Sequence, residues 1–528
     1  MRSARRICHT LVFAALLATP SADAAHGQAS SNEEVGAAST FLPPGHWSVR
    51  AVRRLAAAGL IDGGFDAGQR ALRIGEIARL LESATASAAG PLADVARSYR
   101  DRFTEELRPV SSQSGLWRLR RAAVEAGWTN EEGRVLAGIG YSNVDDWTGT
   151  EPVPDDSGPL ARLPLAASIG KAVGVSATPA WRRDEATLEE AHVVAELGPV
   201  GAWAGRRAVG YGYGEGGSVV LSGNVALDGI GLYLTRPARL PGFLRAIGPI
   251  RLETFGSRVE NGDLIREPWF WAARAHIAPH GRLGIGFNRG AMFGGEGNAP
   301  VTLRNLFYVL VGEHGGEQGE FANQVMSLDV RWRPPLGGVP VETYVEWGFD
   351  DTSGGYHRSP GIIAGLRLAA LPGVPAAELG IERASFAAAS IKNTIWYRNW
   401  SLRGGWTHDR ALLGHPVAGH GTEWLLFGGA DLAAARVRFD ARVALRDRAE
   451  ENLLAPERTG KSTAAVITAE VRALPWLEVT AGAVYEDGAS DWRSSSAVIA
   501  ARAWFVSRTA TPDVVPTTRR DGCPSCVR

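Results

Sequence analysis

The chain has 528 residues, of which 56 are basic and 56 are acidic, so its formal net charge is zero. This balance gives no general electrostatic basis for binding nucleic acid, and we expect no nucleic-acid partner. The 64 glycines and 17 tryptophans, with 45% hydrophobic residues, favour a turn-rich β protein over a helical enzyme.

Residues 1–24 have the pattern of a secretory signal peptide. Arg2, Arg5 and Arg6 precede the short apolar segment LVFAALLA, and Ala22-Asp23-Ala24 is a small-x-small cleavage site. Residues 25–40 follow as a polar linker. We therefore expect an exported protein, and no later apolar run reaches the ~20 residues that a membrane helix needs.

Residues 41–130 have a helical pattern and predict a small helical domain. In HWSVRAVRRLAAAGLI, the residues Trp47, Val52 and Leu55 lie near one face of a helix that begins at His46-Trp47 and stops at Gly59. The segments RIGEIARLLESA, PLADVARSYRDRFTEEL and SGLWRLRRAAVEAG predict three further helices.

From about residue 133 the hydrophobic period changes to two. In RVRFDARVALRD, Val437, Phe439 and Val443 share one face, whereas Arg438 and Arg442 share the other. The segments VETYVEWGFD, MSLDVRWR, RLGIGFNR and LEVTAGAVYE repeat this alternation. A soluble sandwich and a membrane barrel both use such strands, with the apolar face in a protein core or in lipid respectively.

Strand length separates these two architectures. Soluble strands average ~5–6 residues, whereas these segments reach the ~9–11 residues of a tilted membrane strand. Many end in aromatic residues, as an interfacial girdle would: Trp269, Trp271, Trp332, Trp347, Trp504 and Phe505. We predict an all-β transmembrane barrel of about 18 antiparallel strands over residues 131–508, followed by a polar tail at 509–528.

The strand count also predicts where the connections lie. With an even count and a periplasmic N-terminus, long loops face outward, at 145–159, 294–320 and 407–422. Short turns face inward, as at 278–281.

Several local motifs bear on whether the protein binds a nucleotide or a metal or catalyses a reaction. The glycines of GYGYGEGG (210–217) lack a following helix and indicate a strand end or turn. His408, His415 and His420 are close in sequence, but no acidic or cysteine partner holds a zinc-like spacing with them. Neither G-x-S-x-G nor H-E-x-x-H occurs. We expect no metal, no cofactor and no enzyme activity, and a local disulfide between Cys523 and Cys526 in the tail.

The inward faces carry charges in blocks, with arginines at 436, 438, 442 and 446 and carboxylates at 342, 346 and 350. Two interpretations stay open at this point. Opposite charges pair across strands inside the barrel, or the arginines line a polar duct or a surface for an acidic sugar polymer, since the guanidinium fork suits carboxylates.

Parts of the sequence resemble two known families. PPGHWSVRAVRRLAAAGLIDGGF followed by LRIGEIARLLESA resembles one S-layer-homology repeat, without its Thr-Arg pair. Over nearly the whole mature chain, three segments resemble the capsule assembly protein family Wzi: residues 265–297, 339–351 and YRNWSLRGGWTHDRALLGHPVAG at 397–419. This resemblance implies an eighteen-stranded outer-membrane barrel with a helical bundle closing its periplasmic end.

The resemblance further implies that the protein binds capsular or exopolysaccharide and organises it on the cell surface, without catalysis, in contact with outer-membrane lipid. We expect a monomer, although the sequence leaves the oligomeric state open. The residues that we expect to contact the polysaccharide are Trp147, Arg289, Trp400, His408 and His415. The alternatives are a porin or saccharide channel with a helical periplasmic extension and, third, an outer-membrane lipid or ester hydrolase with a non-local triad.

Overall fold

The structure is a computed structural model. It describes residues 39–504 with gaps at 62–63, 107–116, 132–134, 137–138, 141–157, 171, 183–184, 261–264, 312–314, 317–318, 321, 351–359, 387–395, 398–401, 403–404, 409–410, 418, 451–458 and 490–492. The predicted signal peptide, most of the predicted linker and the predicted polar tail lie outside these residues.

The helical elements are few and short. They are α1 (Trp47–Ala57), α2 (Ile74–Ser87), α3 (Pro91–Glu106), the 3-10 helix η3 (Gly242–Ile247) and α4 (Leu303–Val311). Within the described part of the chain, each helix is too short or too polar to cross a membrane.

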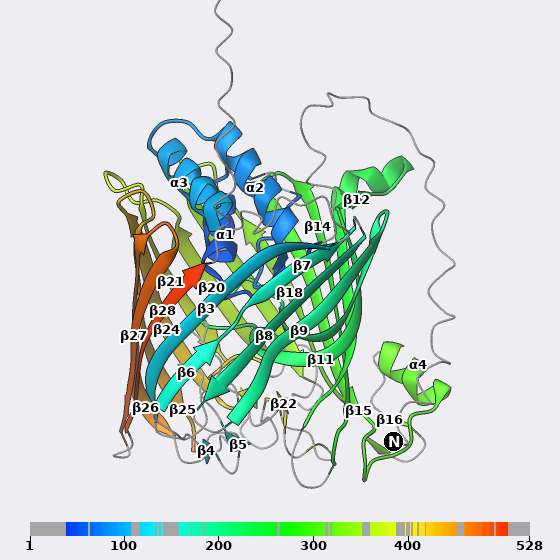
Figure 1. Cartoon of the computed structure of the whole chain (residues 1–528). Helices are drawn as coiled ribbons and strands as arrows, with labels where there is room; N and C mark the ends of the chain where they lie inside the picture. Colours follow the sequence, from blue (N-terminus) through cyan, green and yellow to red (C-terminus); the bar gives the residue numbers. More distant parts are fainter. Residues whose placement is uncertain are drawn as a thin grey trace, which may run out of the picture. The chain divides into compact units, whose positions relative to one another are not determined.

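One closed antiparallel sheet dominates the structure (Figure 1). Its segments are β3 (Trp117–Glu131), β6 (Gly158–Arg162), β7 (Leu165–Ile169), β8 (Val173–Arg182), β9 (Glu185–Leu197), β10 (Val200–Gly210), β11 (Ser222–Leu234), β12 (Ala238–Arg239), β13 (Pro249–Arg258), β14 (Trp269–His280), β15 (Leu283–Phe293), β18 (Ala322–Trp332), β19 (Val341–Asp350), β20 (Gly361–Leu368), β21 (Ala377–Ser385), β24 (Gly421–Leu432), β25 (Val437–Arg448), β26 (Gly460–Leu474), β27 (Leu477–Gly488) and β28 (Arg493–Trp504).

These segments make eighteen crossings. The segments β6 and β7 are two parts of one strand, because both pair with β3 on one side and with β8 on the other. The two-residue β12 lies at the rim, where β11 also pairs directly with β13. Short two-stranded pairs lie outside the barrel sheet: β1 (Phe41–Leu42) with β2 (Leu72–Arg73), β4 (Val135–Leu136) with β5 (Ile139–Gly140), β16 (Gly315–Gly316) with β17 (Gly319–Glu320), and β22 (Thr407–His408) with β23 (Ala411–Leu412). The predicted barrel and strand number are confirmed.

The barrel closes between its first and last strands, β3 and β28, which pair from Ala123↔Trp504 to Glu131↔Ser496. This finding corrects one predicted helix. SGLWRLRRAAVEAG is rich in helix-forming residues, but Trp117 onwards belongs to β3 because the barrel needs a partner for β28.

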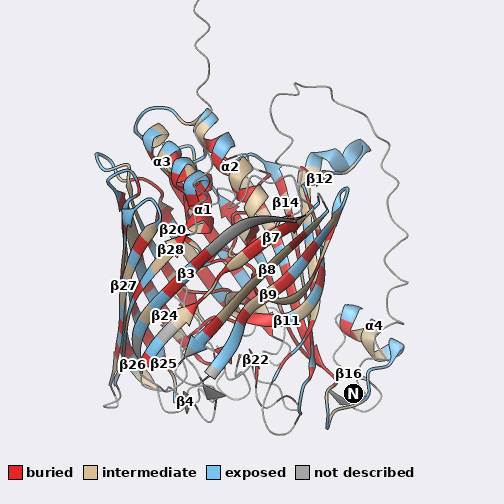
Figure 2. Ribbon diagram, in the orientation of Figure 1, coloured by how far each residue is buried: buried red, intermediate tan, exposed pale blue. Residues whose placement is uncertain are grey.

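Buried and exposed residues alternate along the strands, and the apolar face points outward as predicted (Figure 2). In β25, Phe439 and Val443 are exposed on the outside, whereas Arg438 and Arg446 are buried inside. The predicted girdle residues Trp269, Trp332 and Trp347 are 40–49% exposed. Trp504 was predicted to join them, but it is buried, with the Arg472 guanidinium 5.7 Å from its ring centre.

The helices α1–α3 lie at one end of the barrel, and α4 lies at the other end on the β15–β18 connection (Figure 1). The prediction of a long connection at 294–320 is consistent with this placement. The turn between β14 and β15 is short, as predicted for 278–281.

Helix α1 begins and ends where the sequence predicts. His46 is its N-cap and accepts a hydrogen bond from the Ser48 amide, and Gly59 follows the C-cap with φ +84°. Ten of its eleven residues are buried, including Arg53 and Arg54. A helix buried on all sides must lie inside the barrel, where its polar face meets the wall.

A buried ion-pair cluster joins the helical segment to the wall. Asp66 follows α1 in the chain, and its carboxylate accepts from both Arg274 Nε (2.6 Å) and Arg274 Nη2 (2.8 Å). On β14, Arg274 also donates to Asp329 Oδ2 (2.6 Å) of β18. Burial by itself would raise the pKa of Asp66, but the Arg274 guanidinium lowers this pKa well below its usual range.

Replacing Arg274 by Met should loosen the helical segment from the barrel. The substitution leaves Asp66 and Asp329 buried without their cation, a change that typically costs about 3–5 kcal/mol. Hydrogen exchange of the α1 amides in detergent-solubilised protein measures the loss. The control is Arg97→Met, which breaks the exposed Arg97–Asp94 pair of α3. Equal α1 protection in both variants would contradict this role.

The same cluster predicts a pH dependence. Because the folded pKa of Asp66 is lowered, its stabilising contribution is complete above its unfolded pKa of about 3.9 and is lost only as pH falls towards the folded pKa. The free energy of α1 opening, corrected for intrinsic exchange, should therefore be flat between about pH 7 and 5 in the wild type. In Arg274→Met, Asp66 stays buried without its cation, which raises the pKa of its carboxyl group. Because the neutral acid is tolerated better in this site, the protection of the α1 amides against hydrogen exchange should recover as pH falls.

Candidate functional site

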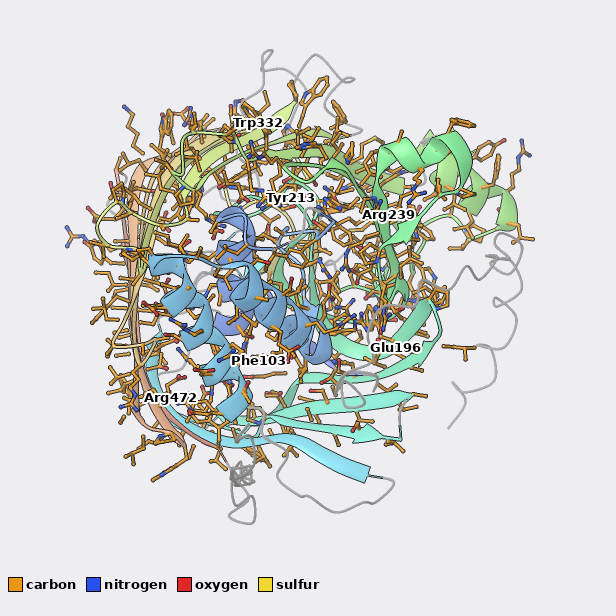
Figure 3. All side chains as sticks on the ribbon, turned by 90° about the horizontal axis from the view of Figure 1, so that it is seen from above. Phe103, Glu196, Tyr213, Arg239, Trp332 and Arg472 are labelled. Carbon is orange, nitrogen blue, oxygen red and sulfur yellow. The ribbon has the colours of Figure 1, made fainter. Side chains whose placement is uncertain are left out.

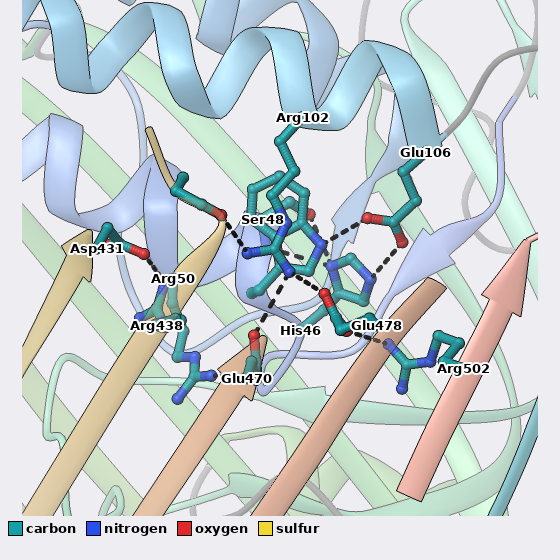
Figure 4. A network of polar contacts seen from close by, with 12 residues as sticks. His46, Ser48, Arg50, Arg102, Glu106, Asp431, Arg438, Glu470, Glu478 and Arg502 are labelled. Atoms are coloured by element: carbon teal, nitrogen blue, oxygen red, sulfur yellow. Dashed lines mark hydrogen bonds and ion pairs between the residues drawn. The ribbon is translucent and has the colours of Figure 1, made fainter. Parts of the chain in front are cut away.

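The face of α1 that carries arginines is held by carboxylates of the barrel wall (Figure 4). Arg50 Nη2 lies 3.5 Å from Glu470 Oε1 of β26. Arg54 Nη1 lies 3.0 Å from Asp431 Oδ2 of β24. These pairs explain why arginines alternate with apolar residues in α1, since the helix meets acidic strands on one side and other helices on the opposite side.

Helix α3 is fixed to the next strands in the same way. Arg102 Nη2 lies 2.6 Å from Glu478 Oε2 of β27, and its guanidinium carbon lies 4.0 Å from the ring centre of Trp47. The indole of Trp47 donates to Glu106 Oε2 at 2.7 Å. Figure 4 shows this network spanning α1, α3 and the wall. The helical segment is therefore fixed to the inner wall of the barrel through α1 and the buried face of α3.

Two connections between barrel strands also fill the lumen. Residues 211–221, between β10 and β11, include Tyr211, Tyr213, Val219 and Val220, all at most 2% exposed. The described parts of residues 386–420, between β21 and β24, pack against them, since Trp406 Nε1 donates to Val220 O at 2.7 Å. The lumen is thus occupied by protein from the helical segment and from both connections.

The glycine-rich segment 210–217 lies at the end of β10 and in the connection that follows, and its glycines allow the backbone to approach buried side chains closely. A β-carbon at Gly212, whose φ is +78°, would lie 2.5 Å from Glu346 Oε2, and one at Gly216 would lie 2.8 Å from Glu423 Oε1. The chain must therefore pass close to buried carboxylates. The backbone amides of Glu215 and Gly216 donate to Glu382 at 2.6 and 2.9 Å.

Three residues of the predicted luminal charge blocks pair with an opposite charge nearby. Arg438 Nε lies 2.7 Å from Asp440 Oδ2. Arg446 Nε lies 2.6 Å from Glu423 Oε2. Glu342 accepts from Arg331 of the neighbouring strand. For these residues the structure favours mutual neutralisation over an open polar duct.

Of the five predicted polysaccharide contacts, the structure describes three, namely Arg289, His408 and His415, and all three are buried. Trp147 and Trp400 lie outside the described residues. Arg289 is buried and donates to the carbonyl oxygens of Val309 and Leu310 at the end of α4, so it caps that helix. His408 is buried, and its Nδ1 accepts from the Glu260 amide at 3.1 Å.

The fifth predicted residue, His415, is completely buried beside two carboxylates. Its Nε2 lies 4.0 Å from Glu382 Oε1 and 3.8 Å from Glu423 Oε1. Its Nδ1 accepts from the Val417 amide at 3.2 Å. An imidazole that accepts at Nδ1 carries its proton on Nε2, so this nitrogen has no lone pair to offer a metal in this arrangement. Burial lowers the pKa of His415 to about 4, which keeps the ring neutral.

One Ser–His–carboxylate contact occurs at the start of α1. Ser48 Oγ lies 2.8 Å from His46 Nδ1, and His46 Nε2 lies 3.6 Å from Glu106 Oε1. The same Nδ1 accepts from the Ser48 amide as the helix cap, and Ser48 is 0% exposed. A nucleophile needs access to its substrate, so this contact is better explained as a helix cap than as a catalytic triad.

A cavity at the helical end carries a group of arginines that the sequence did not single out. Its volume is about 440 Å³, and it lies between α2 and the β11–β13 rim. Its charged lining consists of Arg79, Arg236, Arg239, Arg251 and Glu76. Figure 3 views this end from above and shows Arg239 at the rim. Arginine is frequent throughout this chain, so only the fold could identify this group.

Comparison with known proteins identifies the family. The family model of the capsule assembly protein Wzi matches residues 84–492. A solved structure from Escherichia coli, described as Wzi, an outer membrane protein involved in group 1 capsule assembly and a carbohydrate-binding β-barrel, aligns with a TM-score of 0.68 and 15% identity. That alignment covers 88% of this chain and 98% of the other.

Two structures from Pseudomonas aeruginosa align less well. OccK11 (OpdR) gives a TM-score of 0.46 at 11% identity over 74% of this chain and 95% of its own. OccD3 (OpdP) gives 0.45 at 9% identity over 76% and 94%. The comparison with curated proteins gives no match. Because the matched family region spans more than half of the sequence, this eighteen-stranded outer-membrane barrel belongs to the Wzi family of capsule assembly proteins.

Proposed function

We propose that the protein binds capsular or exopolysaccharide at the cell surface and retains it there without catalysing a reaction. The observation that carries this proposal is the filled lumen. The helical segment and two luminal connections occupy the barrel interior and pair with its charges, so the barrel acts as a platform. The carbohydrate-binding description of the Escherichia coli relative supports the same class of ligand.

In this proposal the helical end faces the periplasm and the opposite end meets the polymer. Many weak contacts along a repeating polymer give firm retention through multivalency. Since Arg289, His408 and His415 are buried, we assign the direct contacts to the two remaining predicted residues, Trp147 and Trp400. Their indole rings would stack on sugar rings.

Replacing Trp147 and Trp400 together by Ala should reduce cell-associated capsule. An aromatic contact contributes about 0.5–1.5 kcal/mol, so each lost contact should weaken binding roughly two- to tenfold. The measurement is the ratio of cell-bound to released polysaccharide at equal amounts of folded barrel in the outer membrane. The control is Trp476→Ala, which removes an equally large indole, 47% exposed, from the β26–β27 turn. Unchanged retention in the double variant would refute these contacts.

The alternative function, a porin or saccharide channel, requires an open lumen. We expect no steady single-channel conductance from the intact mature protein in a planar bilayer. A variant lacking residues 41–106 should conduct weakly, because residues 211–221 still occupy the lumen, and shortening that connection as well should raise the conductance. The deletion must end before Trp117, since β3 is needed to close the barrel.

Steady conductance of the intact protein would favour the channel. Circular dichroism of each variant reports whether its β-barrel has formed, so a silent variant with an intact barrel is distinguishable from an unfolded one.

A further inference from the structure

The arginines of the cavity at the helical end are not neutralised by their surroundings. Arg251 Nη2 lies 2.8 Å from Glu76 Oε1, but Glu76 also pairs with Arg70 at 2.7 Å and lies 4.0 Å from Arg73. Glu76 is therefore shared by three arginines, of which Arg73 also pairs with Glu196. Proximity to these cations lowers the pKa of Glu76 despite its burial, which alone would raise it.

The remaining three arginines have no acidic partner. Among the described residues, no carboxylate lies within ion-pair distance of Arg79, Arg236 or Arg239. Arg79 donates only to the Gly75 carbonyl of its own helix, at 3.3 Å. Many luminal arginines pair with a carboxylate, as Arg446 does with Glu423 and Arg331 with Glu342. Arg236 and Arg239 are exposed and line the cavity without such a partner, so the cavity carries excess positive charge.

The shape of the cavity suits a saccharide. Its volume of about 440 Å³ lies within the ~300–1,000 Å³ of small-molecule sites. Its neutral lining combines Phe65, Leu80, Pro237 and Pro249 with the hydroxyl residues Ser83 and Thr235. Apolar and hydroxyl groups beside guanidinium groups match a sugar ring that carries a carboxylate, since arginine binds carboxylates through two parallel hydrogen bonds.

We propose that this cavity is a second saccharide site, at the helical end, which binds the carboxylate of an acidic sugar unit through Arg236, Arg239 and Arg79. The inference rests on the proposed function and deepens it, because it adds a contact for an acidic polymer at the helical end of the barrel. Residues of both the helical segment and the barrel rim line the cavity, so a bound sugar would also bridge them.

Isothermal titration calorimetry of the refolded mature protein with a tetrasaccharide of galacturonic acid tests the proposal. We expect binding that weakens as salt rises from about 50 to 300 mM, and no binding of the carboxyl-reduced tetrasaccharide. The double variant Arg236→Ala/Arg239→Ala should lose at least tenfold in affinity. Arg245→Ala is the matched control, since Arg245 is an exposed arginine of η3 in the same connection and does not line the cavity.

Three outcomes would overturn the proposal. Equal affinity of the double variant and the control would place the acidic saccharide elsewhere. Inorganic phosphate competing at lower concentration than galacturonate would make the site a phosphate site. Arginine-dependent binding of phosphatidylglycerol vesicles without tetrasaccharide binding would make the rim a lipid contact.

The two proposals fail separately. Tetrasaccharide binding that depends on Trp147 and Trp400 but not on Arg236 and Arg239 would leave the surface function intact and exclude the cavity. Normal cavity binding together with unchanged capsule retention in the Trp147/Trp400 variant would support the cavity site and exclude the contacts at Trp147 and Trp400.

Discussion

The structure depends on pairing of charges inside a closed barrel. Strands with an apolar outer face place their charged residues in the lumen, where water is excluded once protein fills the space. A buried charge without a partner is strongly destabilising, so the filling must carry complementary charges. Helix α1 supplies arginines to Asp431 and Glu470, and Asp66 supplies a carboxylate to Arg274. The charges of the luminal segments and those of the barrel wall are therefore complementary.

This constraint also explains the composition of the helical segment. A helix of a soluble protein has one apolar face and one solvated face. In α1 the second face is largely shielded from solvent, since Arg53 and Arg54 are buried and Arg50 pairs with the wall. Their long side chains span the gap between helix and strand, and the guanidinium groups bind carbonyl and carboxylate oxygens together, as Arg54 does with Pro375 O and Asp431 Oδ2. An S-layer-homology-like pattern is thus compatible with a role inside a barrel.

The alternation of apolar and polar residues predicted the barrel well, because it identifies the outer and inner face of each strand without reference to the other strands. The alternation in 341–350 and 437–448 gave the inward and outward faces, and strand length separated a membrane barrel from a sandwich. The predicted helix at 114–127 was wrong because its composition suits a helix, while pairing with β28 is a property of the whole sheet. The luminal connections were missed for a similar reason, since glycine-rich turns carry no periodic signal.

The candidate sites depend on contacts that are distant in sequence. Arg289 was predicted to bind saccharide from its residue type, but its partners are carbonyl groups at the end of α4. His415 was weighed as a metal ligand from its histidine neighbours, but its own neighbours in space are Glu382 and Glu423. Among the cavity arginines, Arg79, Arg236 and Arg239 have no carboxylate within ion-pair distance in the described part of the chain, and no sequence pattern records this.

The pairing of β3 with β28 has a consequence for biogenesis. The lumen becomes an enclosed space only when the last strand meets the first, yet α1 precedes the first strand and is buried against the inner wall of the finished barrel. The segment before the first strand contacts β14 through Asp66 and β27 through Arg102, so its full set of contacts is available only once strands from both parts of the sheet are in place. Such a high-contact-order step is slow, and a factor that holds the sheet open would set the rate at which the protein matures.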